Sequence, residues 1–150
     1  MSVIVLEGGI YGYIVPAARA IAGYIMALIL AIGGGWAVTI LNAMIGYPWV
    51  GSTFFSLYIV GVGLGAGLGA YLAWINLSMR WYVVIITVVV VMLAGIAGST
   101  IGYVFWEPLF GENYLGPRDS QINATHFWAP IGAIVISSLL GLFFHFRTRS

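Results

Sequence analysis

The chain has 150 residues, of which 62% are hydrophobic and 6% are charged, and its formal net charge is +1. A soluble domain has about 25% charged residues, so this composition excludes a protein that faces water on all sides. The small net charge provides no basic patch for a nucleic-acid partner, and a chain without cysteine has no disulfide, thiolate nucleophile or cysteine-ligated metal of its own.

Four continuous apolar stretches are long enough to cross about 30 Å of hydrocarbon as helices. They cover residues 16–44, 53–77, 81–106 and 127–146. Pro16 suits the first position of the first helix, where its missing N–H costs nothing. Barrel strands alternate polar and apolar residues, and these stretches do not. The connections are short except for residues 107–126, so we expect one transmembrane domain over residues 1–150. The predicted fold is an all-α integral membrane bundle of four helices, running up-down-up-down.

The second stretch contains "VGVGLGAGLGAYLAW", residues 60–74, with a glycine at every second position from 61 to 69. A helix turns about 100° per residue. One stripe therefore consists of Gly61, Gly65 and Gly69, and a second, on nearly the opposite side, of Gly63 and Gly67. Small residues four apart let helix backbones approach closely, so we expect this helix to lie between two neighbours. An alternative is that one stripe faces another chain.

Glycines of the first and third stretches are candidates to dock against these stripes. They are Gly33, Gly34 and Gly35 in the first stretch and Gly95, Gly98 and Gly102 in the third. Together with the five glycines of the second stretch, those of the third form the predicted helix-packing interface.

The alternating glycine run resembles the inner-ring helix of ATP-synthase c subunits, and the four-helix proteolipids of V-type ATPases have a similar length. Members of that family work through one carboxylate in the middle of the membrane. Here all the acids lie outside the predicted spans; they are Glu7, Glu107, Glu112 and Asp119. The resemblance covers residues 61–69 alone and implies close helix packing without the ion-carrying function.

The predicted spans contain no deep ionisable residue of the kind that marks proton and ion pathways. Nothing in the sequence resembles a nucleophile with its base, a phosphate-binding loop or a metal-ligand pattern, so we expect no catalytic site, cofactor or metal. The mid-span hydroxyls are expected to bond to a backbone carbonyl one turn earlier. They belong to Thr39, Thr87, Ser99, Thr100, Ser137 and Ser138. An alternative for the last two is a pore lining in an oligomer.

Three polar residues near the span ends are candidates for contact with lipid or a partner: Arg19, His126 and His145. Interfacial histidines are the expectation, and the alternative is a hydrogen bond to a quinone headgroup or a ligand for a site that a neighbouring chain builds. Asn123 begins the triplet Asn-Ala-Thr and is a candidate for glycosylation.

Orientation follows from arginine, which is enriched on the cytoplasmic side of membrane proteins. Four crossings place the N-terminus, the connection between the second and third helices and the C-terminus on one side. That side holds Arg19, Arg80, Arg147 and Arg149, whereas the other holds only Arg118. We therefore expect a plasma-membrane protein with cytoplasmic N- and C-termini and with the loop 107–126 outside.

These features favour a non-catalytic, multi-pass membrane subunit, not an enzyme, that packs within a larger complex, respiratory or otherwise energy-transducing. Its expected partners are the lipid bilayer and either other membrane subunits or copies of itself, with no nucleic acid. One alternative is a small homo-oligomeric channel or transporter. A second alternative is an architectural membrane protein of a lattice or virion.

Overall fold

The computed structural model describes residues 4–73, 80–105 and 117–147. Over these ranges the chain forms four helices, which are α1 (Ile4–Met44), α2 (Gly51–Leu72), α3 (Trp81–Val104) and α5 (Pro117–Arg147). Each contains a stretch that is long and apolar enough to cross a membrane. These stretches are Ile14–Met44, Gly51–Leu72, Trp81–Val104 and Ile122–Leu140. The predicted fold class, an all-α membrane bundle of four helices, is confirmed.

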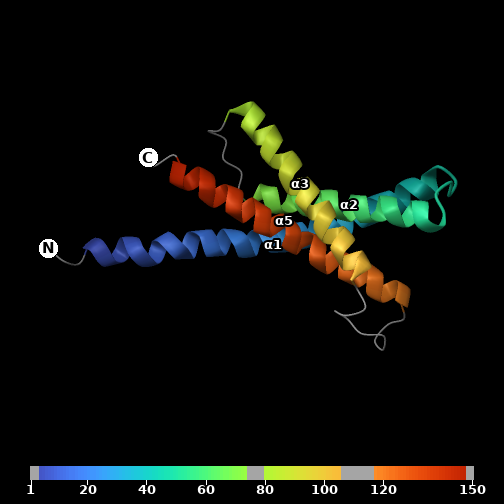
Figure 1. Ribbon diagram of the computed structural model, residues 1–150, viewed down its shortest axis with the longest axis horizontal. Helices are drawn as coiled ribbons and strands as arrows, with labels where there is room; N and C mark the ends of the chain where they lie inside the picture. Colours follow the sequence, from blue (N-terminus) through green and yellow to red (C-terminus); the bar gives the residue numbers. More distant parts are fainter. Residues whose placement is uncertain (1–3, 74–79, 106–116, 148–150) are drawn as a thin grey trace.

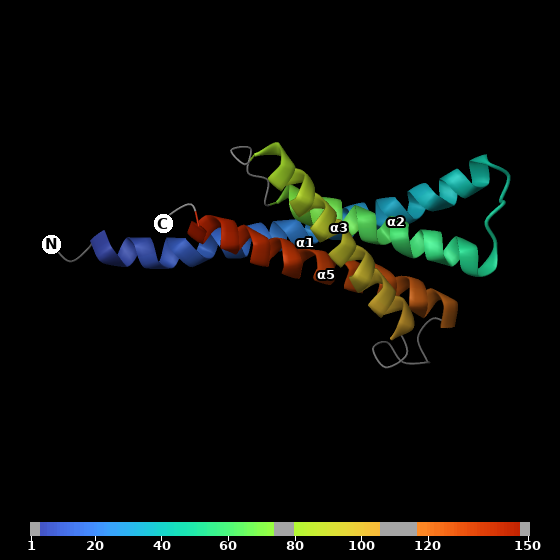
Figure 2. The ribbon, with the colours of Figure 1, turned by 45° about the horizontal axis from the view of Figure 1, so that its top comes forward.

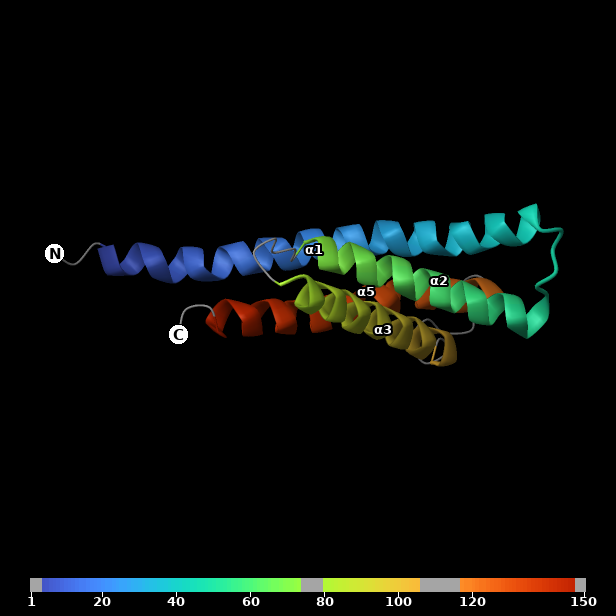
Figure 3. The ribbon, with the colours of Figure 1, turned by 90° about the horizontal axis from the view of Figure 1, so that it is seen from above.

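Successive helices run in opposite directions, as the predicted up-down-up-down order requires (Figure 1). The start of α1 and the end of α5 lie at one end of the bundle, toward which α2 ends and α3 begins (Figure 3). We call this the terminal end. The opposite end, which we call the turn end, holds the connection from α1 to α2 and the start of α5.

Helix α2 lies between α1 and α3, and α5 packs against all three of the other helices. Within the described ranges α1 and α3 do not contact each other. Helix α3 crosses α2 and α5 obliquely, whereas α1 and α5 run more nearly along the long axis (Figure 2). The glycine-rich helix α2 and helix α5 therefore both join α1 to α3.

Helix α1 corrects the predicted start of the first helix at Pro16. It begins at Ile4, has 41 residues and contains Pro16 in its interior. At 1.5 Å per residue it is about 60 Å long, and its first turns project past the bundle at the terminal end (Figure 3). An interior proline removes one backbone hydrogen bond, but transmembrane helices tolerate this loss, so the proline does not mark the boundary.

Helix α5 corrects the predicted loop 107–126. The helix begins at Pro117, where the fixed φ of proline suits a first helical position, so residues 117–126 are helical. Residues 106–116, with Glu107 and Glu112, lie outside the described residues. The other predicted ends differ less, since α2 ends at Leu72 and α3 at Val104.

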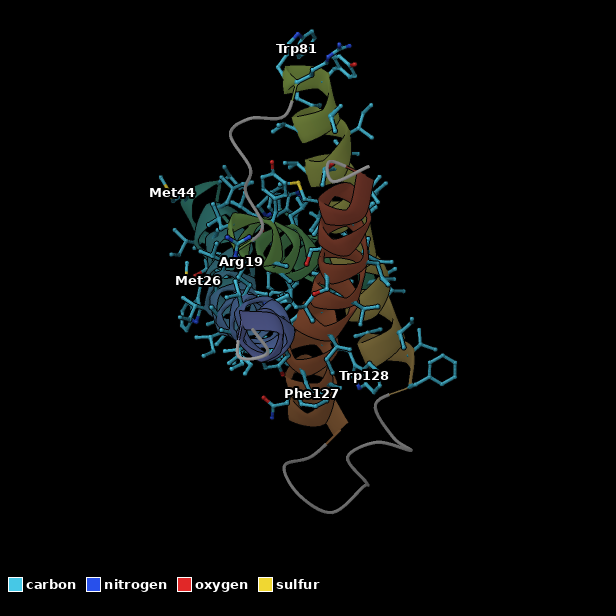
Figure 4. All side chains as sticks on the ribbon, turned by 90° about the vertical axis from the view of Figure 1, so that its left-hand side faces the viewer. Arg19, Met26, Met44, Trp81, Phe127 and Trp128 are labelled. Carbon is cyan, nitrogen blue, oxygen red and sulfur yellow. The ribbon has the colours of Figure 1, made fainter. Side chains whose placement is uncertain are left out.

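The centre of the bundle is built mainly from small side chains. The fully buried alanines of the central cluster come from three helices and are Ala27, Ala31, Ala66, Ala70, Ala129 and Ala133. Large apolar side chains point outward instead: Met44 is 78% exposed and Trp81 is 74% exposed (Figure 4). Small interiors and large lipid-facing side chains are typical of membrane helices, because close backbone approach drives their association in hydrocarbon.

Candidate functional site

The surfaces between the helices are the candidate site, and the first of them joins α2 to α1. The α2 glycines here are Gly61, Gly65 and Gly69, and the α1 backbone oxygens they approach are those of Gly34, Leu30 and Met26. A Cβ at Gly61 would lie 2.8 Å from the Gly34 oxygen and 2.5 Å from Cγ2 of Val38. Cβ atoms at Gly65 and Gly69 would also collide with backbone. This seam has no room for a methyl group.

The other two glycines of the run lie against α3. A Cβ at Gly63 would collide with the backbone of Ile96, and one at Gly67 with the backbone of Met92. From the other side, a Cβ at Gly95 would meet the carbonyl oxygen of Gly63. Helix α2 is thus in backbone contact with a different helix on each of its two glycine stripes.

A third seam joins α3 to α5. Gly98 lies against the carbonyl oxygen of Trp128, and Gly102 against that of Ala124. A Cβ at Gly102 would lie 2.5 Å from the Ala124 oxygen. Helix α5 contributes a glycine of its own, Gly132, whose Cβ would lie 2.6 Å from the Ala94 oxygen. The sequence has no small-residue stripe at Gly132, because no second glycine lies one turn away.

The α1 glycines differ from one another in their surroundings. Gly34 lies against the carbonyl of Gly61, and Gly35 makes room for the ring of Tyr58, which would lie 2.8 Å from a Cβ at Gly35. Gly33 has nothing within 4 Å of its Cβ position and is exposed. Only two of the three adjacent glycines therefore contact another helix within the described part of the chain.

Tyr58 and His126 form a polar pair between α2 and α5 near the turn end. The Tyr58 hydroxyl lies 3.2 Å from Nε2 of His126, and Nδ1 of the same ring lies 2.8 Å from the carbonyl oxygen of Ile122. A carbonyl only accepts, so we assign the ring proton to Nδ1; Nε2 of the neutral ring then accepts from the tyrosine hydroxyl. Both ring nitrogens of the candidate contact residue His126 thus have partners within the chain.

This pair belongs to a group of aromatic rings at the turn end. Ring centroids 5.7 to 6.2 Å apart link Phe54, Phe55, Tyr58, Tyr103 and His126. The rings come from α2, α3 and α5, and edge-on or tilted contacts of this kind add to packing. No sequence pattern connects these residues, because Tyr58 and His126 are 68 positions apart.

A second polar contact, which no sequence pattern predicts, closes the turn between α1 and α2. The side chain of Asn42 is buried, donates from Nδ2 to the carbonyl of Trp49 at 3.0 Å and accepts from its N–H at 3.1 Å. The helix itself ends in a Schellman motif. The Tyr47 N–H donates to the Asn42 carbonyl at 2.8 Å, and Gly46 takes a φ of 83°. Through its two hydrogen bonds, the Asn42 side chain holds the backbone of Trp49 against the end of α1.

The mid-span hydroxyls mostly bond within their own helix, as the sequence predicts. Those of Thr39, Thr87 and Thr100 donate to the carbonyl four residues earlier, and that of Ser137 to the carbonyl three residues earlier. Ser99 is an exception that corrects the expectation. It is fully buried, and its hydroxyl donates across the helix boundary to the carbonyl of Ile59 in α2, at 2.9 Å.

The remaining candidate residues are not brought together by the fold. Arg19 is exposed on α1, one turn beyond Gly23 toward the terminal end (Figure 4). Asn123 is exposed on α5 inside the membrane-spanning stretch, and Thr125 of the same triplet is buried. His145 lies in α5 outside the residues whose side chains the structure describes. Among the described residues no group of three or more His, Cys, Asp or Glu side chains could hold a metal ion.

No protein-family model, curated protein or solved structure matches this chain. The fold and its contact surfaces define a membrane-spanning helical bundle.

Proposed function

We propose that this chain is a non-catalytic, multi-pass membrane subunit, not an enzyme, that packs within a larger membrane protein complex, respiratory or otherwise energy-transducing. Glycines hold three helix pairs in backbone contact, which are α1–α2, α2–α3 and α3–α5. These contacts would keep the bundle rigid, so that its outer surface has a fixed shape for partners. The partners would be lipid and other membrane subunits.

The observation that carries this proposal is how the polar side chains deep in the spans are used. The hydroxyl of Ser99 and the pair of Tyr58 and His126 tie helices to one another, and the mid-span threonines donate to carbonyls of their own helices. Transport and catalysis in membranes depend on ionisable or unpaired polar groups along a pathway. Here the hydroxyls and the histidine named above serve the contacts that hold the bundle together, which supports a structural role; Nε1 of Trp128 is buried without a hydrogen-bond partner and does not contribute to this observation.

The outward face of α1 offers a surface for a partner helix. Gly33 leaves an opening on this face, and the neighbouring Trp36 is 62% exposed. A small residue beside a large one is a surface on which a partner side chain packs well. A photo-crosslinking amino acid at Trp36 should capture another membrane subunit, whereas the same probe at Leu93, exposed on α3, should label lipid.

The proposed location is the plasma membrane, with the terminal end on the cytoplasmic side and the turn end outside. The support is the distribution of arginine, since Arg19 lies on α1 toward the terminal end and Arg80 directly precedes α3. Positive side chains near the ends of spans remain preferentially in the cytoplasm.

Mild detergent extraction followed by native mass measurement tests the proposal. Co-purification at constant stoichiometry with larger, cofactor-bearing membrane subunits is the expected result. A ring made of this chain alone that conducts ions in liposomes would refute it and favour the channel or transporter. Assembly of the purified chain into an extended sheet or shell would instead favour the architectural alternative.

A further inference from the structure

The contact between α2 and α5 is made by side chains and not by close backbones. The described glycines of α2 lie against α1 and α3, and Gly132 of α5 lies against α3. Alanines of both helices, among them Ala66 and Ala129, belong to one buried cluster in the middle of the bundle. Nearer the turn end, the hydrogen bond between Tyr58 and His126 links the two helices. A contact of this kind can change when one side chain changes its charge.

The two helices diverge at the turn end, where the start of α5 lies away from the start of α2 (Figures 1 and 2). Tyr58 comes two turns after the start of α2 at Gly51, and His126 follows the start of α5 at Pro117 by nine residues. The hydrogen bond therefore lies close to the point of divergence, where it holds α5 against α2.

The surroundings of His126 fit its neutral ring. The side chain is half-buried, one turn inside the spanning stretch that begins at Ile122. Its Nδ1 atom lies 2.8 Å from the Ile122 carbonyl oxygen, which can only accept. Nδ1 therefore carries the proton, and Nε2 accepts from the Tyr58 hydroxyl at 3.2 Å.

Protonation of His126 would disrupt this arrangement. Nε2 would become a donor, so the Tyr58 hydroxyl would have to turn its own proton away. The partner that the structure describes for this hydroxyl is His126 itself, and no other described acceptor replaces it. A charge inside a spanning stretch is also costly unless an opposite charge lies beside it.

The described side chains that face the imidazole are neutral. Helix α1 contributes Gly35, which lies against the Tyr58 ring, and no titratable group. The remaining groups to consider are one phenol from α2, one phenol from α3 in the same aromatic group, and a cation and an acid two turns earlier in α5, whose side chains lie outside those described. They are Tyr58, Tyr103, Arg118 and Asp119.

We propose that His126 is a proton-sensitive contact between α2 and α5. Its neutral ring holds the two helices together, and protonation breaks the contact so that the turn end of the bundle opens. A free histidine is protonated below about pH 6.5. The stabilisation is therefore fully present above this pH, where the ring is neutral in both the folded and the unfolded chain, and is lost as the pH falls below it.

Spin labels on the two helices test the opening directly. The chain has no cysteine, so single labels can be placed at Ser56 of α2 and Asn123 of α5, both of which are exposed. Pulsed electron paramagnetic resonance in micelles should give a longer and broader distance distribution at pH 5.0 than at pH 7.5. A control pair at Ala37 of α1 and Ser56 spans the glycine contact of α1 with α2 and should not change. An unchanged distribution for the first pair, or an equal change in both pairs, would overturn the proposal.

Two matched variants identify the group that takes up the proton. His126→Gln keeps an acceptor for the Tyr58 hydroxyl but does not titrate, so its distance distribution should be the same at both pH values. His145→Gln changes the other histidine of the chain and should respond as the wild type does. A response that persists in His126→Gln, or disappears in His145→Gln, would show that another group carries the pH dependence, and the proposal would fail.

Unfolding measurements give the magnitude. Uptake of one proton on unfolding raises the unfolding equilibrium constant by up to about tenfold per pH unit. Between pH 6.5 and 5.5 the ratio of this constant in the wild type to that in His126→Gln should rise toward that limit, and a constant ratio would refute the proposal. If His126→Gln does not fold, Tyr58→Phe decides. It removes the donor that favours the neutral ring, so the opening should occur about one pH unit higher; an unchanged midpoint would contradict the role of the pair.

Discussion

The seam between α1 and α2 makes a sharp prediction about one methyl group. In Gly65→Ala the new Cβ would collide with the carbonyl oxygen of Leu30 and lie 2.7 Å from its carbonyl carbon. These are backbone atoms, so no side-chain rotation relieves the overlap, and α1 must move away from α2. The matched control is Gly33→Ala, where nothing lies within 4 Å of the new Cβ.

The comparison of the two variants isolates the packing contribution to stability. Both exchange glycine for alanine inside a helix, which by itself favours the helix by about 1 kcal/mol. Overpacking a tight site typically costs about 1 to 3 kcal/mol. Because the helix propensity gain is common to both, the difference in their free energies of unfolding should equal the overpacking cost. We expect Gly65→Ala to be less stable than Gly33→Ala by about 1 to 3 kcal/mol.

Equilibrium unfolding in mixed micelles, followed by far-UV circular dichroism, measures this difference. Gly33→Ala should be as stable as the wild type or more stable, and Gly65→Leu should lose more than Gly65→Ala. Equal unfolding free energies for the two alanine variants would show that the backbones do not meet at Gly65, and the reasoning would fail. Gly98→Ala is no neutral control, since its Cβ would also collide with backbone, at Trp128 of α5.

Three further predictions concern the turn end. Asn42→Asp keeps the shape of the side chain but loses the donor to the Trp49 carbonyl. It should lower the free energy of unfolding in micelles by about 1 to 3 kcal/mol, and an unchanged value would show that the hydrogen bond between Asn42 and Trp49 does not form. Tyr58→Phe leaves Nε2 of His126 without its donor and should cost about 1 kcal/mol in the same assay, whereas no loss would show that the pair does not form. A cysteine in place of Ser120 should react with an impermeant maleimide from outside intact cells, and labelling only after lysis would reverse the proposed orientation.

The helices and their order could be predicted from the sequence because long apolar runs leave little choice in a bilayer. Helix ends were harder to predict. A proline is common both at a first helical position and inside a membrane helix, so Pro16 did not distinguish the two. The loop before α5 had polar residues and glycines typical of turns, yet the helix begins at Pro117. There the periodic apolar signal is weak, so the sequence does not mark the boundary.

Some contacts between helices could likewise be predicted from the sequence, and others could not. Residues four apart share a helix face, so the two stripes of α2 follow from the positions of Gly61 and Gly63 alone, and the structure places these glycines against α1 and α3. The hydrogen bond of Ser99 does not follow from the sequence. It depends on how α3 is oriented about its own axis. The position of a serine in the sequence does not indicate whether its hydroxyl faces its own helix or a neighbouring one.

The four helix pairs that surround the bundle are not equally tight. The pairs α1–α2, α2–α3 and α3–α5 each have glycines whose Cβ positions fall on the backbone of the partner helix. Between α1 and α5 the described glycine contact is that of Gly23, and its nearest neighbour is the flexible end of the Ile134 side chain, at 2.6 Å. A side chain at this junction holds the backbones apart, and a groove opens beside it. The bundle therefore closes through three backbone seams, whereas its fourth side is spaced by a side chain and is packed less closely.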